Sequence, residues 1–275
     1  MTLSTTRNNP AKQKKVKTKK QKAIAATCAV AFWLLVWHVV SLCVGSELVL
    51  VSPVKVVQTL FTVIFDPDFL KTVWYSAARI LGGFFTALTL GTVLGWVASR
   101  FWVVETLLRP ITAVIKATPV ASFIILVLLW FSGKNLSVII SMLMVFPVIY
   151  MNVLEGIRSA DEKLLEMAQV FRLSVGKKLL YIYLPAVAPF FVSACSVSLG
   201  LCWKSGIAAE VIGTPDGSIG AVFYQAKIFL QTSELLAWTV VVVAVSVAFE
   251  KLFMLLLRLV LKKLKMEDVL NGKRA

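Results

Sequence analysis

The segment SADEKLLEMAQVFRLSVGKKLLYIYLP, residues 159–185, is a charged stretch that lies between two long apolar runs. Ser159 is followed three residues later by Glu162, a capping-box pattern that predicts a helix start at Ser159. Apolar side chains then recur at helical spacing and predict one apolar face on this helix, carried by Leu164, Leu165, Ala168 and Phe171.

A turn and a second short helix complete the segment. The turn is expected over 173–176, and the helix, which carries Lys177 and Lys178, is expected to end at Leu184. Pro185 then stands where the next apolar helix can begin, since proline is tolerated in a first helical turn. An apolar face on a segment outside the membrane indicates docking onto another protein. The alternative is a cytoplasmic loop that packs on its own helix bundle.

The composition is that of an integral membrane protein. Of the 275 residues, 59% are hydrophobic and 16% are charged, and the mean hydropathy is +0.84. Long apolar runs separated by short polar segments exclude an ordinary soluble core. We therefore expect an all-α integral membrane protein with six transmembrane helices, at residues 23–43, 74–98, 108–131, 136–157, 185–211 and 235–260.

These runs define a transmembrane domain over 23–260, between a basic tail (1–22) and a C-terminal tail (261–275). The first run is interpreted as a retained span. A signal peptide is the alternative, but the run is 21 residues long, carries Trp33 and Trp37 and lacks a small-residue cleavage site. Within the third run, Pro119 predicts a kink or a break.

The distribution of basic residues predicts the orientation of the chain. The net charge is +15, and most Lys and Arg lie in the two tails, in 99–109 and in 158–183. The positive-inside rule then places both termini and the segment 158–184 in the cytoplasm. Basic clusters beside membrane spans bind anionic headgroups, so we expect membrane lipids as their partner and no nucleic acid.

Two further patterns concern helix length and helix packing. The segments 54–65 and 219–230 are expected to form short outer helices, since neither is long enough to span a bilayer. Gly91 and Gly95 form a small-xxx-small pattern that predicts close packing against another helix.

No pattern in the sequence predicts covalent chemistry. None of the three Gly-Lys pairs is preceded at five residues by the glycine of a phosphate-binding loop. The only histidine, His38, lies inside the first run, where packing is a simpler interpretation than a pathway role. The four cysteines lack metal-ligand spacing. We therefore expect no enzyme, no metal and no cofactor bound by this chain.

The charged segment resembles the cytoplasmic EAA loop in the membrane subunits of ABC importers. That family pattern is Glu-Ala-Ala, three residues, Gly, nine residues, Ile, any residue, Leu-Pro. The positions that keep the register are Glu166, Met167 (in place of Ala), Ala168, Ile182, Leu184 and Pro185. Arg172 replaces the family glycine, and because arginine does not adopt positive φ freely we expect the turn to move toward Gly176.

Two other stretches resemble the sulfonate, taurine and nitrate branch of these permeases. The first is Ser76-x-x-Arg79 followed by Gly83-Phe84. The second is AEVIG at 209–213 followed by GSIG at 217–220.

The resemblance implies the type I permease fold of ABC importers and a transport subunit without an ATPase motif. The implied partners are a second copy of the chain, an extracytoplasmic solute-binding protein, and two cytosolic ATPases that use ATP. Those ATPases would grip the docking loop, with Glu166, Met167, Ala168, Phe171, Arg172, Gly176, Leu184 and Pro185 as its residues. The implied location is a bacterial inner (plasma) membrane, and the implied substrate is a small anion such as a sulfonate or nitrate.

The fifth run is rich in small and polar residues, which suit close packing or a polar path. The pathway candidates are Ser193, Ser196, Lys204 and Glu210. Lys204 lies about 28 Å from Pro185, near the outer edge of a ~30 Å core. Snorkelling explains it without function, and attraction of an anion at the outer mouth is the alternative. Glu210 starts the outer segment and is expected to hold its turn.

A secondary transporter without an ATPase partner is the alternative to an importer subunit. Such transporters tend to show internal repeats and ionisable residues near the bilayer midplane. This sequence has no clear repeat, and Arg79, Lys204 and Glu210 all stand near span boundaries.

Overall fold

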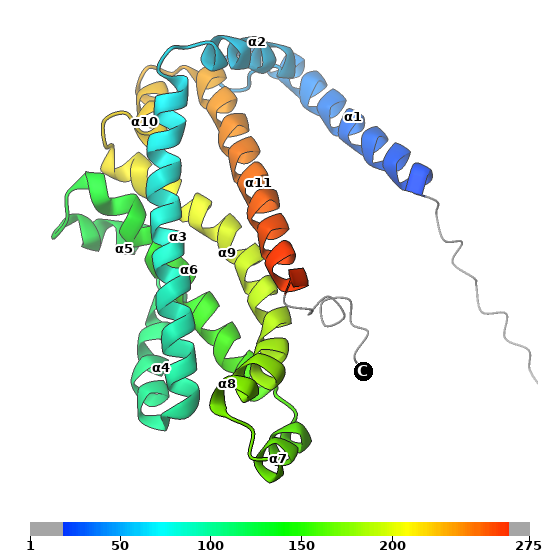
Figure 1. Cartoon of the computed structure of the whole chain (residues 1–275). Coiled ribbons are helices and arrows are strands. Elements are labelled where there is room, and N and C mark those ends of the chain that lie inside the picture. Colours follow the sequence, from blue (N-terminus) through cyan, green and yellow to red (C-terminus); the bar gives the residue numbers. More distant parts are fainter. Residues whose placement is uncertain (1–18, 264–275) are drawn as a thin grey trace, which may run out of the picture. The chain divides into compact units, whose positions relative to one another are not determined.

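The structure, a computed structural model, describes residues 19–263. It divides into two units, residues 1–55 and 56–275, which are described separately. Every regular element in the described range is a helix (Figure 1), as the sequence predicts. The predicted tails lie outside the described residues over 1–18 and 264–275.

The first unit contains α1 (Lys19–Val44) and the start of α2 (Pro53–Ile64). The predicted first span corresponds to α1, which is long and apolar enough to cross a membrane. Gly45 ends this helix with a φ of +63°, a conformation that glycine adopts without strain. The indole Nε1 of Trp37 donates to the Val51 carbonyl at 3.1 Å, so the chain after α1 folds back beside its last turns.

Four long helices build the second unit: α3 (Phe69–Arg100), α6 (Gly133–Arg158), α9 (Leu184–Gly213) and α11 (Thr232–Lys263). α6 packs against both α3 and α9 (Figure 1). The core between them consists of apolar side chains, among which Ile80, Phe84, Ile149, Leu199 and Trp203 are almost completely buried. These helices contain the predicted second, fourth, fifth and sixth runs, each extended by a few residues.

The glycine pattern on α3 lies at its contact with α6, as predicted. A Cβ added to Gly91 would lie 2.9 Å from the Cβ of Ile149, and one added to Gly95 would lie 3.0 Å from Cγ1 of Val153. Both distances are shorter than ordinary van der Waals contacts. The absence of side chains at these two positions therefore allows the backbones of α3 and α6 to approach closely.

The prediction of a third span over 108–131 is wrong in its start, whereas the predicted kink or break at Pro119 is confirmed. α4 (Trp102–Ala117) begins directly after α3, and α5 (Val120–Leu128) follows after a bend of 105°. The break lies at Thr118, whose ψ of 133° is extended, because a residue before proline disfavours helical backbone and Pro119 lacks an N–H. Within residues 19–263, five helices are apolar and long enough to cross a membrane, or six if α4 and α5 form one broken span.

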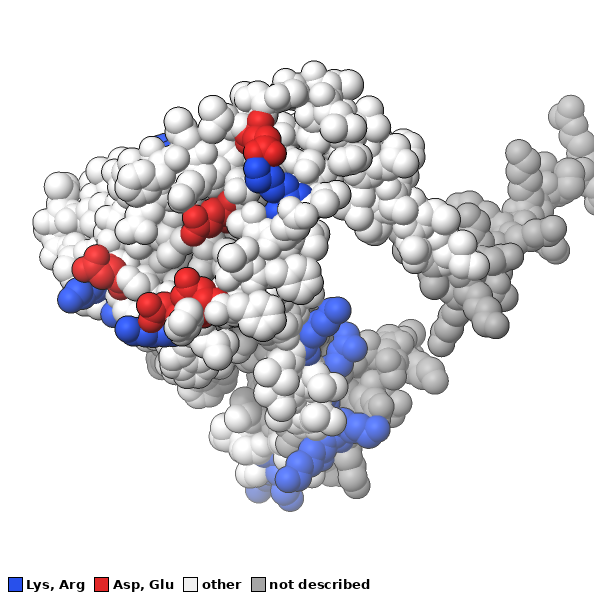
Figure 2. Space-filling view, turned by 90° about the horizontal axis from the view of Figure 1, so that it is seen from above, with Lys and Arg blue, Asp and Glu red and all other residues white. Residues whose placement is uncertain are grey.

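The two predicted short helices are confirmed as α2 and α10 (Ile219–Ile228), and their outer location stays a prediction. In the second unit, α10 lies at the end opposite to α7 (Glu162–Val170) and α8 (Val175–Lys178), as Figure 1 shows. Seen from the α10 end, Asp and Glu side chains lie beside Lys and Arg side chains (Figure 2). The surface in this view therefore carries charges of both signs.

Candidate functional site

The charged segment folds as the short helix α7, a turn, and the start of a long helix. The predicted capping box at Ser159 is wrong: the Ser159 hydroxyl donates to the Gly156 carbonyl at 2.9 Å, at the end of α6. Asp161 is the N-cap instead, and its Oδ1 accepts from the Lys163 N–H at 2.9 Å. An aspartate satisfies a free N–H and also complements the positive end of the helix dipole.

The predicted apolar face of α7 divides into an inner and an outer part. Ala168 is fully buried, and Leu165 packs in the same cluster with Ile182 and Leu173. The outer part is exposed and consists of Leu164, Met167, Val170 and Phe171, with 42%, 46%, 79% and 70% of their surfaces exposed. One face thus anchors α7 to its own chain, while the other presents apolar side chains outward.

Arg172 forms the turn after α7 without the family glycine. Its φ is +49°, the Leu173 N–H bonds the Ala168 carbonyl at 2.9 Å, and the Arg172 N–H bonds the Gln169 carbonyl at 3.0 Å. These bonds form a Schellman motif, and Leu173 and Ala168 supply its usual apolar contact. The expectation that the turn moves toward Gly176 is therefore wrong, since Gly176 lies within α8.

No break separates the charged segment from the fifth span. α8 continues through a π-helical turn, Leu179–Tyr183, into α9, so Val175–Gly213 is one helix of 39 residues. Pro185 cannot donate a helical hydrogen bond, and a π-turn is a known means of accommodating such a gap. The predicted short helix therefore does not end at Leu184 but continues directly into α9. Leu184 and Pro185 lie inside this continuous helix.

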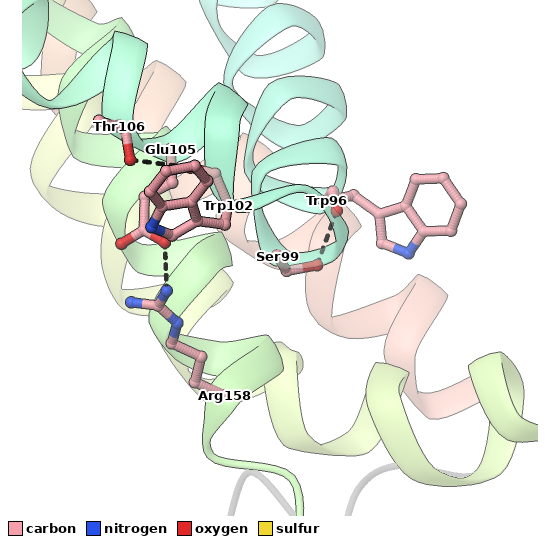
Figure 3. A network of polar contacts seen from close by, with 6 residues as sticks. All are labelled: Trp96, Ser99, Trp102, Glu105, Thr106 and Arg158. Atoms are coloured by element: carbon pink, nitrogen blue, oxygen red, sulfur yellow. Dashed lines mark hydrogen bonds and ion pairs between the residues drawn. The ribbon is translucent and has the colours of Figure 1, made fainter.

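An ion pair joins the helices that support this segment. The Arg158 guanidinium at the end of α6 bonds the Glu105 carboxylate in the first turn of α4 (Figure 3). Near them, the Thr106 hydroxyl donates to the Trp102 carbonyl at 3.0 Å, and the Ser99 hydroxyl donates to the Trp96 carbonyl at 2.6 Å. Because Arg158 directly precedes the charged segment, this pair connects the base of that segment to α4. Sequence analysis missed it because the two residues are 53 positions apart.

At the opposite end, a buried carboxyl group holds the N-terminus of α10. Glu210 is fully buried, and its Oε2 accepts from the Ser76 hydroxyl at 2.6 Å and the Gly220 N–H at 3.3 Å. The Ser76 hydroxyl in turn accepts from the Ile219 N–H at 2.9 Å, and Ser218 caps the helix by accepting from the Ala221 N–H at 3.0 Å. Three free N–H groups at the start of α10 therefore have side-chain partners.

The four pathway candidates do not converge on one site. Ser193 and Lys204 are exposed on one side of α9. Ser196 points to α11, where its hydroxyl donates to Oε1 of Glu250 at 2.9 Å. Glu210 is buried in the cluster described above. Only Ser193 and Lys204, eleven positions apart on α9, are open to another molecule in this chain.

A bundle of apolar helices, one broken span and an anchored helix with an exposed apolar face define a class of protein. The class is that of a multi-pass helical membrane protein that carries a polar segment outside its apolar spans. The sequence profile of the family described as "Binding-protein-dependent transport system inner membrane component" matches residues 87–266. The chain belongs to this family.

Named relatives cover most of the chain. Identity is 29% over 83% of this chain and 83% of SsuC from Bacillus subtilis, whose name describes an aliphatic sulfonates transport permease. It is 27% over 78% of this chain and 80% of TauC, the taurine transport system permease protein of Escherichia coli. It is 25% over 74% of this chain and 76% of NrtB, the nitrate import permease protein of Synechocystis.

The comparisons support the sulfonate, taurine and nitrate branch and a transport subunit that is not an enzyme. The chain is a multi-pass membrane protein of a binding-protein-dependent ABC transport system. Membership of this family implies an ABC ATPase and a solute-binding protein as partners.

Proposed function

We propose that two copies of this chain form the solute pathway of an ATP-driven importer in a bacterial plasma membrane. Both termini and the docking segment then lie in the cytoplasm, where basic residues meet anionic lipid headgroups. ATP is bound and used by the partner ATPases. A closed symmetric dimer is the commonest arrangement for an oligomer of identical chains.

The substrate in this proposal is a small anion such as a sulfonate or nitrate. The support is that relatives are named for aliphatic sulfonates, taurine, nitrate and bicarbonate. The exposed ammonium group of Lys204 on α9 has the charge that attracts such a solute at the outer mouth. The pathway candidates Ser193, Ser196 and Glu210 lie on the same helix.

The observation that carries the proposal is the exposed apolar face of α7. Val170 and Phe171 are 79% and 70% exposed although each would gain about 1.5–3 kcal/mol from full burial. Such side chains on a charged segment outside the apolar spans suit a groove on a partner protein. In this proposal the ATPases bind this face, with Glu166 and Arg172 at its edges.

The local structure suits a rigid lever between the ATPases and the pathway. The buried Ala168 and the Schellman turn at Arg172 fix α7 against Ile182. Ile182 lies on the helix that continues as α9. A displacement of α7 by a moving ATPase is then passed to α9 through packed side chains, as in hinge and shear transitions between two states.

A co-purification experiment tests this proposal. The tagged chain is expressed with its ATPase and purified in mild detergent, as the wild type and as the double variant Val170→Ser, Phe171→Ser. The variant is expected to reach the membrane at wild-type levels and to lose the ATPase. The matched control is Leu107→Ser, Ile111→Ser, which changes two apolar side chains of α4 that are 65% and 51% exposed.

Two outcomes would contradict the proposal. Equal ATPase recovery with the double variant and the wild type would exclude α7 as the docking face. A wild-type chain that is purified without any ATPase, under conditions that preserve a control ABC complex, would favour a secondary transporter.

A further inference from the structure

A surface cavity of about 400 Å³, open along one side and lined mostly by exposed residues, lies between α4 and α6. Its lining includes Arg109, Thr112, Ala113 and Lys116 from α4 and Met151 from α6. In the sequence, Arg109 is one of the positive-inside charges, and Lys116 carries no predicted role. The cavity therefore brings together two cations and a hydroxyl group that neither the docking segment nor the outer cluster uses.

The polar side chains form one stripe along α4. Four polar residues recur along α4 at spacings of four, three and four positions, which places them on one helix face: Glu105, Arg109, Thr112 and Lys116. The opposite face carries exposed Val103, Leu107, Ile111 and Val114, which suit contact with lipid. The stripe then faces away from lipid, toward the side on which the cavity opens.

Lys116 lies fourteen residues, or about 21 Å, along α4 from Trp102 at the start of that helix. The ammonium group of Lys116 contacts Sδ of Met151 at 3.4 Å, and Met151 is seven residues, or about 10 Å, along α6 from Arg158 at the helix end. Snorkelling carries a lysine head toward the interface, whereas this head lies beside Met151, a partly exposed side chain in the apolar helix α6. Ionisable residues within a membrane span mark substrate or ion pathways.

The two cations have capacity for an anionic partner. The ion pairs among residues 19–263 join Lys55 to Glu47, Lys71 to Asp68 and Arg158 to Glu105, so neither Arg109 nor Lys116 is part of one. The Met151 thioether is only a weak acceptor. Guanidinium groups bind planar and tetrahedral oxyanions through paired N–H donors. About 10 Å of helix separates Arg109 from Lys116, which leaves room for a small oxyanion between them.

We propose that this cavity is a transit site for the translocated solute, at which Arg109 and Lys116 bind a small monovalent oxyanion of the nitrate or sulfonate type. The inference rests on the proposed function, since it requires that α4 lines the path between two copies. In this proposal Arg109 and Lys116 select the solute by its charge within the membrane, in addition to the selection made by the solute-binding protein.

Thiol modification measures the local potential directly. The full chain is purified with its ATPases after Cys28 and Cys43, the exposed cysteines of the described range, are replaced by Ser. Ala113→Cys then places a thiol in the cavity. The rate at which this thiol reacts is measured with an anionic and with a cationic methanethiosulfonate. Each rate is divided by the rate at which the same reagent reacts with a free thiol in solution. The anionic reagent is expected to react faster than the cationic one.

Removal of either cation should weaken this preference. Lys116→Met and Arg109→Gln are each expected to slow the anionic reagent about fivefold, for a charge about 8 Å away at an effective dielectric constant of about 40. The matched control is Lys227→Gln on α10, which removes the same charge from an exposed site that is not part of the cavity. Equal rate ratios in the wild type, Lys116→Met and Arg109→Gln would overturn the proposal.

Anion protection tests the ligand class. Nitrate and methanesulfonate are expected to slow modification of Ala113→Cys more than chloride does at equal ionic strength, and this difference is expected to vanish in Lys116→Met. Equal slowing by chloride would indicate charge screening and overturn the proposal. Slowing by vesicles with anionic lipid alone, and not by the small anions, would assign the cavity to lipid headgroups and also overturn it.

The proposed function is checked on the same preparations. If the wild-type chain retains its ATPase but shows no preference between the two reagents, only the transit site is refuted. If the wild-type chain binds no ATPase, the importer function fails whatever the modification rates are.

Discussion

Replacement of Glu210 tests whether the buried cluster at the start of α10 stabilises the protein. In Glu210→Ala the Ser76 hydroxyl and the Gly220 N–H lose the oxygen that they contact at 2.6 and 3.3 Å. Each buried donor left without a partner costs about 1–3 kcal/mol. The expected loss is therefore about 2–6 kcal/mol, a large part of the roughly 5–15 kcal/mol of a typical folded protein.

Glu210→Gln separates hydrogen bonding from the acidic character of the side chain. The glutamine Oε1 can accept from Ser76 and Gly220, and its amide can donate to the Ser137 hydroxyl. That hydroxyl is buried and has no hydrogen-bond partner within the described residues, and it lies beside the Glu210 carboxyl group. We therefore expect Glu210→Gln to be much closer to the wild type than Glu210→Ala.

Thermal unfolding in detergent is the assay. A loss of 2 kcal/mol corresponds to a fall in Tm of about 4–8 °C for a domain of 150–250 residues. Glu210→Ala should fall by at least this amount and Glu210→Gln by less. A Tm for Glu210→Ala within about 2 °C of the wild type would refute the reasoning, since that shift corresponds to roughly 1 kcal/mol or less.

Three further substitutions test other contacts. Ala168→Leu, at a fully buried position, should destabilise the docking segment by about 1–3 kcal/mol through overpacking and reduce ATPase co-purification, whereas Met167→Leu beside it should have little effect. Arg172→Gly should stabilise the turn by about 1 kcal/mol because the left-handed conformation is strained for arginine. The expected result is greater resistance of the segment to chymotrypsin, and faster cleavage would contradict the prediction. Gly91→Ala should lower Tm because its Cβ would lie 2.9 Å from the Cβ of Ile149, while Gly82→Ala, with open space around it, should not.

Some features of this protein follow from short-range patterns in the sequence. Long apolar runs predict helices because a backbone in lipid must satisfy its own hydrogen bonds, and the starts and ends of α3, α6, α9 and α11 agree with those runs to within several residues. The glycines at 91 and 95 predict close packing against another helix because two missing side chains let any neighbouring backbone approach, and the structure identifies that helix as α6. The alignment of residues 166–185 with the family pattern is also a local property, since it depends only on the spacing of residues within that segment.

Other features depend on residues that are far apart in the chain. The capping box at Ser159 was predicted wrongly because Asp161 offers a competing cap two residues later, and only the path of the chain after α6 decides between them. Arg172 keeps a positive φ because the Schellman bonds and the Leu173–Ala168 contact outweigh the strain at one residue. The turn therefore stays at Arg172.

The sequence by itself determined that this is a helical membrane protein with a charged segment between two apolar runs, because hydropathy, charge and spacing act locally. The tertiary structure alone decided which polar residues meet. Glu210 reaches Ser76, 134 positions away, and Arg158 reaches Glu105, 53 positions away. Lys116 reaches Met151, 35 positions away, because α4 lies against α6. Such pairings depend on how the helices pack, and packing is a property of all their surfaces together.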